Sequence, residues 1–216
     1  MKKLFQILVF LMPFMGLWAQ ITHTSNGNVD ANAEKVLAKA SSKMNSGCVS
    51  FSVAMVSKDA NKKESSKVTS QVLYNKGKYR VTFGDQVLYC NGQSVWNWNK
   101  KAKEVVVDKV SASDDDRMNP AQLLSNYKKN YKAKFIRTEP DGTSVVDLTP
   151  KKSKSFYKVR LLIASSGTIT SMLMHNYDGS SMEFAVSNFK TGVKYSDTDF
   201  TFSTTDHKEV EVIDMR

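Results

Sequence analysis

The 216-residue chain has few of the residues that usually carry chemistry, with three histidines and two cysteines. His23 lies in a polar N-terminal stretch, His175 ends a predicted strand and His207 lies in a late turn. The sequence contains no Gly-x-Ser-x-Gly elbow, no His-Glu-x-x-His helix and no phosphate-binding glycine loop. We therefore expect a protein that is not an enzyme and that holds no cofactor.

Metal ligands and sulfur chemistry are also sparse. The run Asp114-Asp115-Asp116 could bind a cation, but a solvated loop is the simpler interpretation, and no metal site is predicted. Cys48 and Cys90 each lie at the end of a predicted strand. In an exported protein they could form a disulfide or pack as two buried thiols, and the sequence leaves both open.

Long apolar runs are absent except at the N-terminus. Two lysines at 2–3 precede an apolar stretch at 4–17, which is typical of a secretory signal cleaved after Ala19. The stretch is shorter than the about 20 residues that a spanning helix needs, and an uncleaved anchor is the alternative. We expect residues 1–19 to be a signal peptide and residues 20–216 to form one exported, soluble domain.

Positive charge is in excess, because the sequence has 31 lysines and arginines but 21 aspartates and glutamates, which gives a formal net charge of +10. Loss of the two signal lysines would lower it to +8. A basic exported protein is attracted to an anionic membrane surface, although a lysine-rich soluble surface is an equally good explanation. Nucleic-acid binding is not expected, because the lysines are not interleaved with a stacking platform.

The most informative segment runs from 77 to 99. Tyr79, Val81 and Phe83 alternate with more polar residues, as in a strand with one dry face. A second strand at 87–90 leads into the hairpin dipeptide Asn91-Gly92. The returning strand carries two further large apolar side chains on a single face, Trp96 and Trp98. Large apolar surface away from catalytic groups favours binding of a hydrophobic ligand.

The rest of the chain predicts two helices and more strands. One helix starts near Asp30 or Asn32 and ends at 46–47, and a short one is opened by Pro120. Further strands are expected at 49–55, 68–74, 104–110, 132–138, 143–149, 156–164, 168–176, 181–190 and, with a break, 199–213. About eleven strands joined by tight turns form one antiparallel sheet that curls toward a barrel. The predicted class is mainly β with short α-helices.

Four motifs follow one another along the chain. They are Tyr79-Arg80-Val81 with Gly92-Gln93-Ser94-Val95-Trp96, the helix opened by Pro120 with Leu123-Leu124, Val146-Asp147-Leu148-Thr149-Pro150-Lys151, and Phe200-Thr201-Phe202 with Val210-Glu211-Val212-Ile213-Asp214. Together they resemble the periplasmic outer-membrane lipoprotein carriers, the LolA-like proteins. The resemblance covers most of the mature chain.

The resemblance implies an unclosed β-barrel whose helices form a lid over a hydrophobic cavity for acyl chains. It makes lipid-binding candidates of three groups, although ordinary core packing is the simpler interpretation of any single residue and only the set as a whole favours a cavity. The wall candidates are Tyr79, Val81, Phe83, Trp96 and Trp98; the lid candidates are Val36, Leu37, Leu123 and Leu124; the adaptable methionines are Met172 and Met174.

One departure from the family concerns the latch of the lid. Well-studied members have Arg-Pro just before the aromatic strand, and the arginine holds the lid closed. This chain has Lys76-Gly77 there, and lysine is a poorer bidentate donor than arginine. The latch could be absent, replaced or moved to Arg80.

The function implied by the resemblance is that of a monomeric periplasmic carrier. It would take acylated lipoproteins from an inner-membrane lipoprotein-releasing transporter to an outer-membrane acceptor. A fold does not fix a function, so a lipid-binding protein, a lipoprotein sensor or a holder of a partner protein on the same fold is the alternative.

Overall fold

The structure is a computed structural model that describes residues 30–110 and 120–216. The predicted signal peptide, His23 and the Asp114-Asp115-Asp116 run lie outside the described residues. Their interpretation therefore stays a prediction from sequence.

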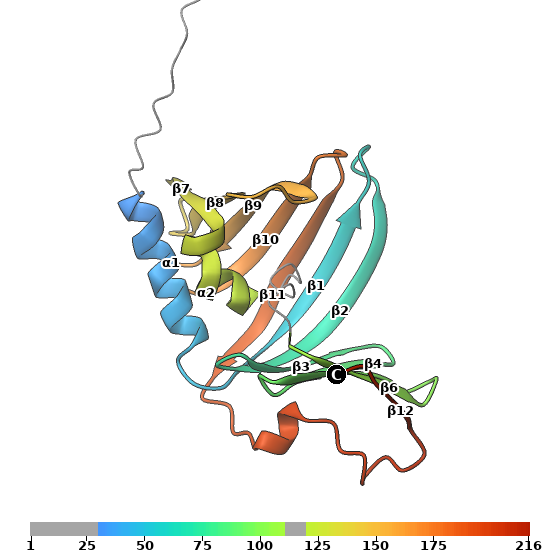
Figure 1. The fold of residues 1–216 in the computed structure, drawn as a ribbon. Helices are drawn as coiled ribbons and strands as arrows, with labels where there is room; N and C mark the ends of the chain where they lie inside the picture. Colours follow the sequence, from blue (N-terminus) through green and yellow to red (C-terminus); the bar gives the residue numbers. More distant parts are fainter. Residues whose placement is uncertain (1–29, 111–119) are drawn as a thin grey trace, which may run out of the picture.

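One twelve-stranded sheet dominates the fold (Figure 1). Its strands are β1 (Val49–Lys58), β2 (Glu64–Asn75), β3 (Lys78–Phe83), β4 (Gln86–Cys90), β5 (Ser94–Asn99), β6 (Glu104–Lys109), β7 (Tyr131–Thr138), β8 (Ser144–Pro150), β9 (Phe156–Ile163), β10 (Ile169–Asn176), β11 (Ser181–Thr191) and β12 (Glu211–Asp214). The order across the sheet is β12-β6-β5-β4-β3-β2-β1-β11-β10-β9-β8-β7. With β12 and β7 as its edges, the sheet is an unclosed barrel, which confirms the predicted fold class.

The sheet is antiparallel except at β12, and the predicted strand with a break over 199–213 is confirmed only at its C-terminal end. That segment contains the 3₁₀ helix η2 (Asp197–Phe200), a loop and only then β12, which pairs in parallel with β6. Phe200 and Phe202 are buried against one face of the sheet instead of continuing a ladder. Apolar spacing alone does not separate these two arrangements.

Both helices lie on the same face of the curled sheet, which we call the inner face (Figure 1). They are α1 (Ala31–Met44) and α2 (Pro120–Asn130). The opposite, outer face carries the C-terminal segment with η2. Each strand of the sheet therefore has one side toward the helices and one side away from them.

Helix α1 is fixed to the sheet at several points. Its N-cap is Asp30, whose Oδ1 accepts from the Ala33 N–H at 3.0 Å. Near its middle, the Lys39 ammonium donates to the Ser165 carbonyl in the β9–β10 turn. Gly167 of that turn has φ +90°, and a Cβ there would lie 3.0 Å from Lys39 Cγ. The turn needs glycine both for its backbone and for the close approach of α1.

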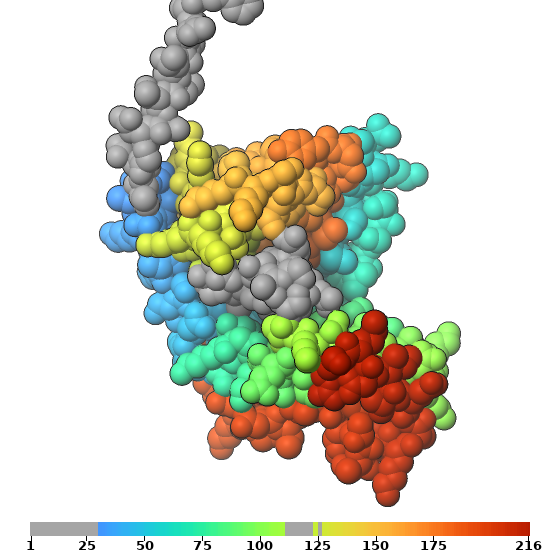
Figure 2. All heavy atoms as spheres, viewed as in Figure 1, coloured from blue at the N-terminus to red at the C-terminus, as the bar shows by residue number. Residues whose placement is uncertain are grey.

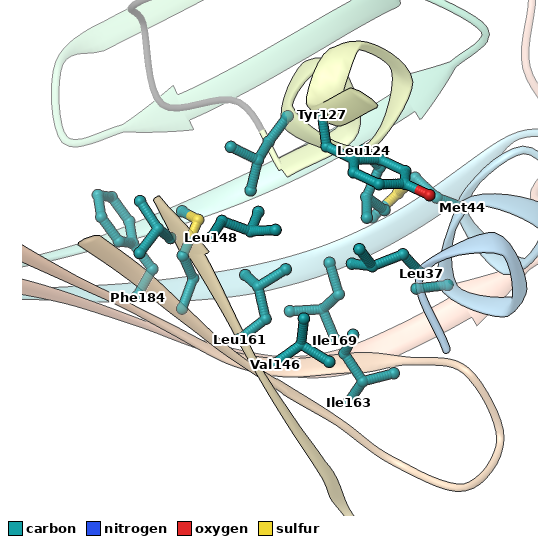
Figure 3. Close-up of a cluster of buried hydrophobic side chains, with 14 of the residues drawn as sticks. Leu37, Met44, Leu124, Tyr127, Val146, Leu148, Leu161, Ile163, Ile169 and Phe184 are labelled. Carbon is teal, nitrogen blue, oxygen red and sulfur yellow. The ribbon is translucent and has the colours of Figure 1, made fainter. Parts of the chain in front are cut away.

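The largest core lies between the helices and the β7–β11 half of the inner face. Leu37 and Met44 of α1 and Leu124 and Tyr127 of α2 point toward apolar residues of the strands (Figure 3). The strand side is supplied by Val146, Leu148, Leu161, Ile163, Ile169 and Phe184, which are all buried. Burying side chains of this size contributes about 1.5–3 kcal/mol each, so this half of the sheet holds the helices.

Two smaller clusters lie on the outer face. One joins Trp96, Val105 and Val107 of the sheet to Phe202 and Val210 of the C-terminal segment. The other is formed by Cys48, Leu73 and Phe200. The C-terminal segment is thus part of the packed fold.

Candidate lipid-binding face

The inner face continues beyond the helices onto β2, β3 and β4. Tyr79 is paired with Tyr74, and Val81 with Val72, so the alternating residues of β3 lie on the same side as the helix-facing residues of β2. On the neighbouring strand β4, Leu88 is paired with Val81 and therefore lies on the same face. The predicted common face of Tyr79, Val81 and Phe83 therefore exists, and it is the inner face.

The two halves of the inner face differ in how far they are covered. In the β7–β11 half, residues such as Val146 and Leu161 are fully buried. In the β2–β6 half, partly exposed apolar side chains lie on the neighbouring strands β2, β3 and β4 and again on β6, where Asn97 of β5 comes between Leu88 and Val106; they are Val68, Val81, Phe83, Leu88 and Val106. We call these five residues the apolar strip. Partly exposed apolar side chains on several adjacent strands are the property expected of a surface that takes a hydrophobic ligand.

The predicted lid residues lie where the helices meet the sheet. Leu37, Leu123 and Leu124 are buried in the main core. Val36 is half-buried and lines a groove of about 410 Å³ with Phe135 and Ile163. The four residues therefore hold the helices on the sheet, as a cover requires.

The two methionine candidates are also on the inner face. Met172 is 1% exposed and Met174 is 7% exposed, and both belong to the core beneath the helices. In this arrangement they fill space instead of lining an open surface.

The two tryptophans do not share a face with Tyr79, Val81 and Phe83, so the prediction of one common wall was wrong in this respect. Trp96 is paired with Tyr89, which is paired with Arg80, and all three lie on the outer face. Trp98 contacts Phe202, with ring centroids 5.3 Å apart. The tryptophans anchor the C-terminal segment, because the register of β3, β4 and β5 turns them away from the helices.

Of the two latch candidates, Arg80 lies on the face away from the helices, so the structure corrects the expectation that the latch has moved to Arg80. Lys76 is exposed in the β2–β3 turn, where it has φ +47° and Gly77 has φ +92°. Positive φ at both central residues is typical of a tight hairpin turn. Arg80 Nη1 donates to Asp199 Oδ1 at 2.9 Å on the outer face. Arg80 therefore ties β3 to η2.

Other residues connect the helices, and the sequence patterns did not single them out. Lys128 of α2 forms an ion pair with Glu34 of α1 at 2.7 Å. The two helices also border a groove of about 510 Å³ lined in part by Leu124 and Tyr127. Because Glu34 and Lys128 are 94 positions apart in the chain, no local spacing could have revealed this pair.

The histidine, cysteine and acidic side chains of the described residues do not gather into a cluster of metal ligands. No group of three or more histidine, cysteine, aspartate or glutamate side chains that could hold a metal ion occurs among the described residues. Burial lowers the pKa of His175, and His207 stacks on Phe202 with centroids 5.2 Å apart. Cys48 and Cys90 are both buried thiols, and burial raises the pKa of Cys48, which makes it a poor nucleophile.

Within 30–110 and 120–216, no helix is long and apolar enough to span a membrane. Comparison with solved structures finds an uncharacterized conserved protein from Thermus thermophilus with a TM-score of 0.59, at 13% identity over 85% of this chain and 99% of the other. This likeness shows the fold.

Two further solved structures are a LolA superfamily protein from Nitrosomonas europaea and a putative outer membrane lipoprotein-sorting protein domain from Vibrio parahaemolyticus. The first has a TM-score of 0.46 and 18% identity, over 79% of this chain and 97% of the other. The second has a TM-score of 0.44 and 16% identity, over 82% of this chain and 100% of the other. A search of the curated proteins gave no significant match.

The family model described as outer membrane lipoprotein carrier protein LolA matches residues 77–203. The match begins at the β2–β3 turn and ends just beyond η2, so it includes α2 and most of the sheet. The chain belongs to the LolA outer membrane lipoprotein carrier family.

Proposed function

We propose that this protein binds the acyl chains of lipids or lipoproteins on the inner face of its sheet, with the apolar strip as the part that contacts them. The observation that carries the proposal is the partial exposure of Val81, Phe83 and Leu88 beside the half-sheet that packs against the helices in the main core. The family description, a lipoprotein carrier, supports the same ligand class.

The expected strength of binding favours partial burial of the ligand. Three acyl chains contain on the order of 45 methylenes, and burying all of them at about 0.8 kcal/mol each would give roughly 35 kcal/mol. Noncovalent affinities reach a limit near ~20 kcal/mol. A carrier must also release its cargo, so a surface that contacts only part of the chains suits the task.

In the finer proposal, the protein is a monomeric periplasmic carrier that receives lipoproteins from an inner-membrane transporter and delivers them to an outer-membrane acceptor. Helices α1 and α2 cover the bound chains, and Met172 and Met174 adapt their positions if the chains extend beneath the helices. The family match supports this assignment.

The experiment is a binding assay with a triacylated peptide and its unacylated form. Phe83→Glu places a charge on the apolar strip and is expected to lower retention of the acylated peptide at least tenfold, because the carboxylate loses its hydration. The matched control is Thr82→Glu, which puts the same charge on the next residue but on the outer face, opposite Val87.

Equal retention by the two variants would overturn the assignment of the apolar strip. Native mass spectrometry of protein purified from its own host then identifies the cargo. A lipoprotein N-terminus supports the carrier, a bare phospholipid or fatty acid indicates a lipid transporter, and a protein partner without lipid indicates a sensor.

A further inference from the structure

One end of the sheet gathers lysines from parts of the chain that are far apart in sequence. The C-terminal end of α2 and the start of β7 meet the β8–β9 loop there, and the Lys151 N–H donates to the Asn130 carbonyl at 2.8 Å. The basic rim is the group of six lysines Lys128, Lys129, Lys132, Lys151, Lys152 and Lys158 of these two segments. In the space-filling view these segments occupy the upper part of the surface, with β3–β6 below (Figure 2).

Among residues 30–110 and 120–216, few carboxylates lie close enough in the fold to offset the charge of the basic rim. Residues 120–136 and 148–159 contain no aspartate or glutamate. Glu34 pairs with Lys128 at 2.7 Å. Asp147 is held by Arg160, whose Nε and Nη2 donate to its two oxygens at 2.7 and 2.8 Å. A strong positive potential therefore remains at this end.

Neighbouring turns extend the same end surface. The β1–β2 and β10–β11 turns lie at the same end of the sheet (Figure 1) and are joined by Lys62 Nζ, which donates to the Gly179 carbonyl at 2.8 Å. The Tyr177 N–H donates to the Ser155 carbonyl at 3.4 Å, which connects the β10–β11 turn to the basic rim. Each of the two turns also carries an aspartate, Asp59 and Asp178, so the excess of charge is greatest over the basic rim.

Two exposed tyrosines accompany the lysines. Tyr157 is 41% exposed and Tyr177 is 73% exposed, and their ring centroids are 5.5 Å apart. Lys158 Nζ lies 5.8 Å from the centre of the Tyr157 ring. Tyrosine beside lysine is the combination found at membrane–water interfaces, where the ring enters the headgroup region and the ammonium pairs with phosphate.

We propose that the basic rim, with Tyr157 and Tyr177, docks the protein on an anionic phospholipid surface. A membrane fits better than an acidic protein because the charges are spread over the end of α2, the start of β7 and the β8–β9 segment, and the two tyrosines are placed beside them. The attraction depends on headgroup charge, so it applies to bare vesicles without lipoprotein and does not depend on the acyl-binding proposal.

The test measures partitioning onto vesicles of phosphatidylglycerol and phosphatidylcholine, with phosphatidylcholine vesicles for comparison. The rim variant carries Lys129→Gln, Lys132→Gln and Lys152→Gln. The control variant carries Lys101→Gln, Lys194→Gln and Lys208→Gln, which remove the same charge from exposed positions outside the basic rim. All six side chains are exposed, so thermal melts are expected to match the parent protein.

The parent protein is expected to bind the anionic vesicles at low salt and to leave them at about 1 M salt, where the Debye length is about 3 Å. Each lysine near an anionic surface contributes to the binding free energy. Because the rim variant lacks three of them, it should bind the anionic vesicles on the order of 100-fold more weakly than the parent. The control variant should stay within a few-fold of the parent, and Tyr177→Ser should weaken binding without changing its salt dependence.

Equal binding by the rim and control variants would overturn the proposal, as would parent binding that does not depend on phosphatidylglycerol. A further arm uses polyglutamate as an acidic polypeptide. Binding to polyglutamate without binding to vesicles would assign the basic rim to an acidic protein and reject the membrane.

Discussion

At the residue scale, Asp30 shows how one side chain can connect a helix to a sheet edge. Its Oδ1 accepts from the Ala33 N–H at 3.0 Å, and its Oδ2 accepts from the Phe135 N–H at 2.8 Å. Phe135 lies on the edge strand β7, where a backbone donor has no further strand to pair with. The sequence predicted a cap at Asp30 or Asn32, and the structure selects Asp30 because only this position reaches both donors.

Replacing this side chain gives the first stability prediction. Asp30→Ala removes the helix cap and leaves the Phe135 N–H without its carboxylate, and we expect a loss of about 1–3 kcal/mol in the free energy of unfolding. Asp30→Asn keeps a capping oxygen and should lose less. Urea denaturation of the three proteins measures the differences, and equal stability of Asp30→Ala and the parent would contradict the double contact.

The same residue predicts a dependence on pH. The backbone hydrogen bonds from Ala33 and Phe135 lower the pKa of Asp30. A lowered pKa in the folded state stabilises the fold above the unfolded-state pKa, and this contribution is lost as the pH falls through the folded value. The stability difference between the parent and Asp30→Asn should therefore shrink from pH 7 to strongly acidic pH, as urea denaturation at each pH would show.

At the element scale, the C-terminal segment is held on the outer face by η2. The Ser196 N–H donates to Asp199 Oδ2 at 2.9 Å, and Asp199 Oδ1 accepts from Arg80 at 2.9 Å. The hydrogen bond from the Ser196 N–H makes the largest contribution to lowering the pKa of Asp199, and the Arg80 guanidinium lowers it further. Beneath them Phe200 is 0% exposed and packs with Cys48 and Leu73. The ion pair is partly exposed and contributes little, so the ring of Phe200 is the main anchor.

Phe200→Ala should therefore destabilise the protein by about 3–5 kcal/mol, because it leaves a cavity under η2. Thr198→Ala, at an exposed position of the same helix, is the control and should change stability by less than about 0.5 kcal/mol. Thermal unfolding measures both, and hydrogen exchange should show faster opening of 196–210 in Phe200→Ala. A small loss, close to that of Thr198→Ala, would show that η2 is not anchored by this ring.

At the scale of the whole molecule, the sheet packs against different partners on its two faces. Cys90 is paired with Tyr79 and lies on the inner face, whereas Cys48 is buried on the outer face with Phe200. The sheet itself separates the two thiols. Of the two alternatives that the sequence allowed, a disulfide or two buried thiols, the structure shows two buried thiols.

This separation predicts that a reducing agent leaves the melting temperature unchanged. Both cysteines should react with a thiol reagent in denaturant, and both should react slowly in the native protein because they are buried. Ser46→Cys, at an exposed position, is a positive control that should react at once. A fall in melting temperature on reduction would indicate a disulfide and contradict the structure.

The sequence by itself determined the strands up to β11, both helices, the hairpin turns and the family, because alternation, capping residues and glycine at positive φ act over a few neighbouring residues. It also determined that Tyr79, Val81 and Phe83 share a side of β3. Only the tertiary structure decided which side of β5 lies on the inner face of the sheet together with Tyr79, Val81 and Phe83. Trp96 is oriented by the register of β3, β4 and β5 together, and a one-residue difference in register exchanges the two faces of a strand. In the same way, the meeting of Glu34 with Lys128 and of Asp30 with Phe135 depended on packing between segments that no local pattern connects.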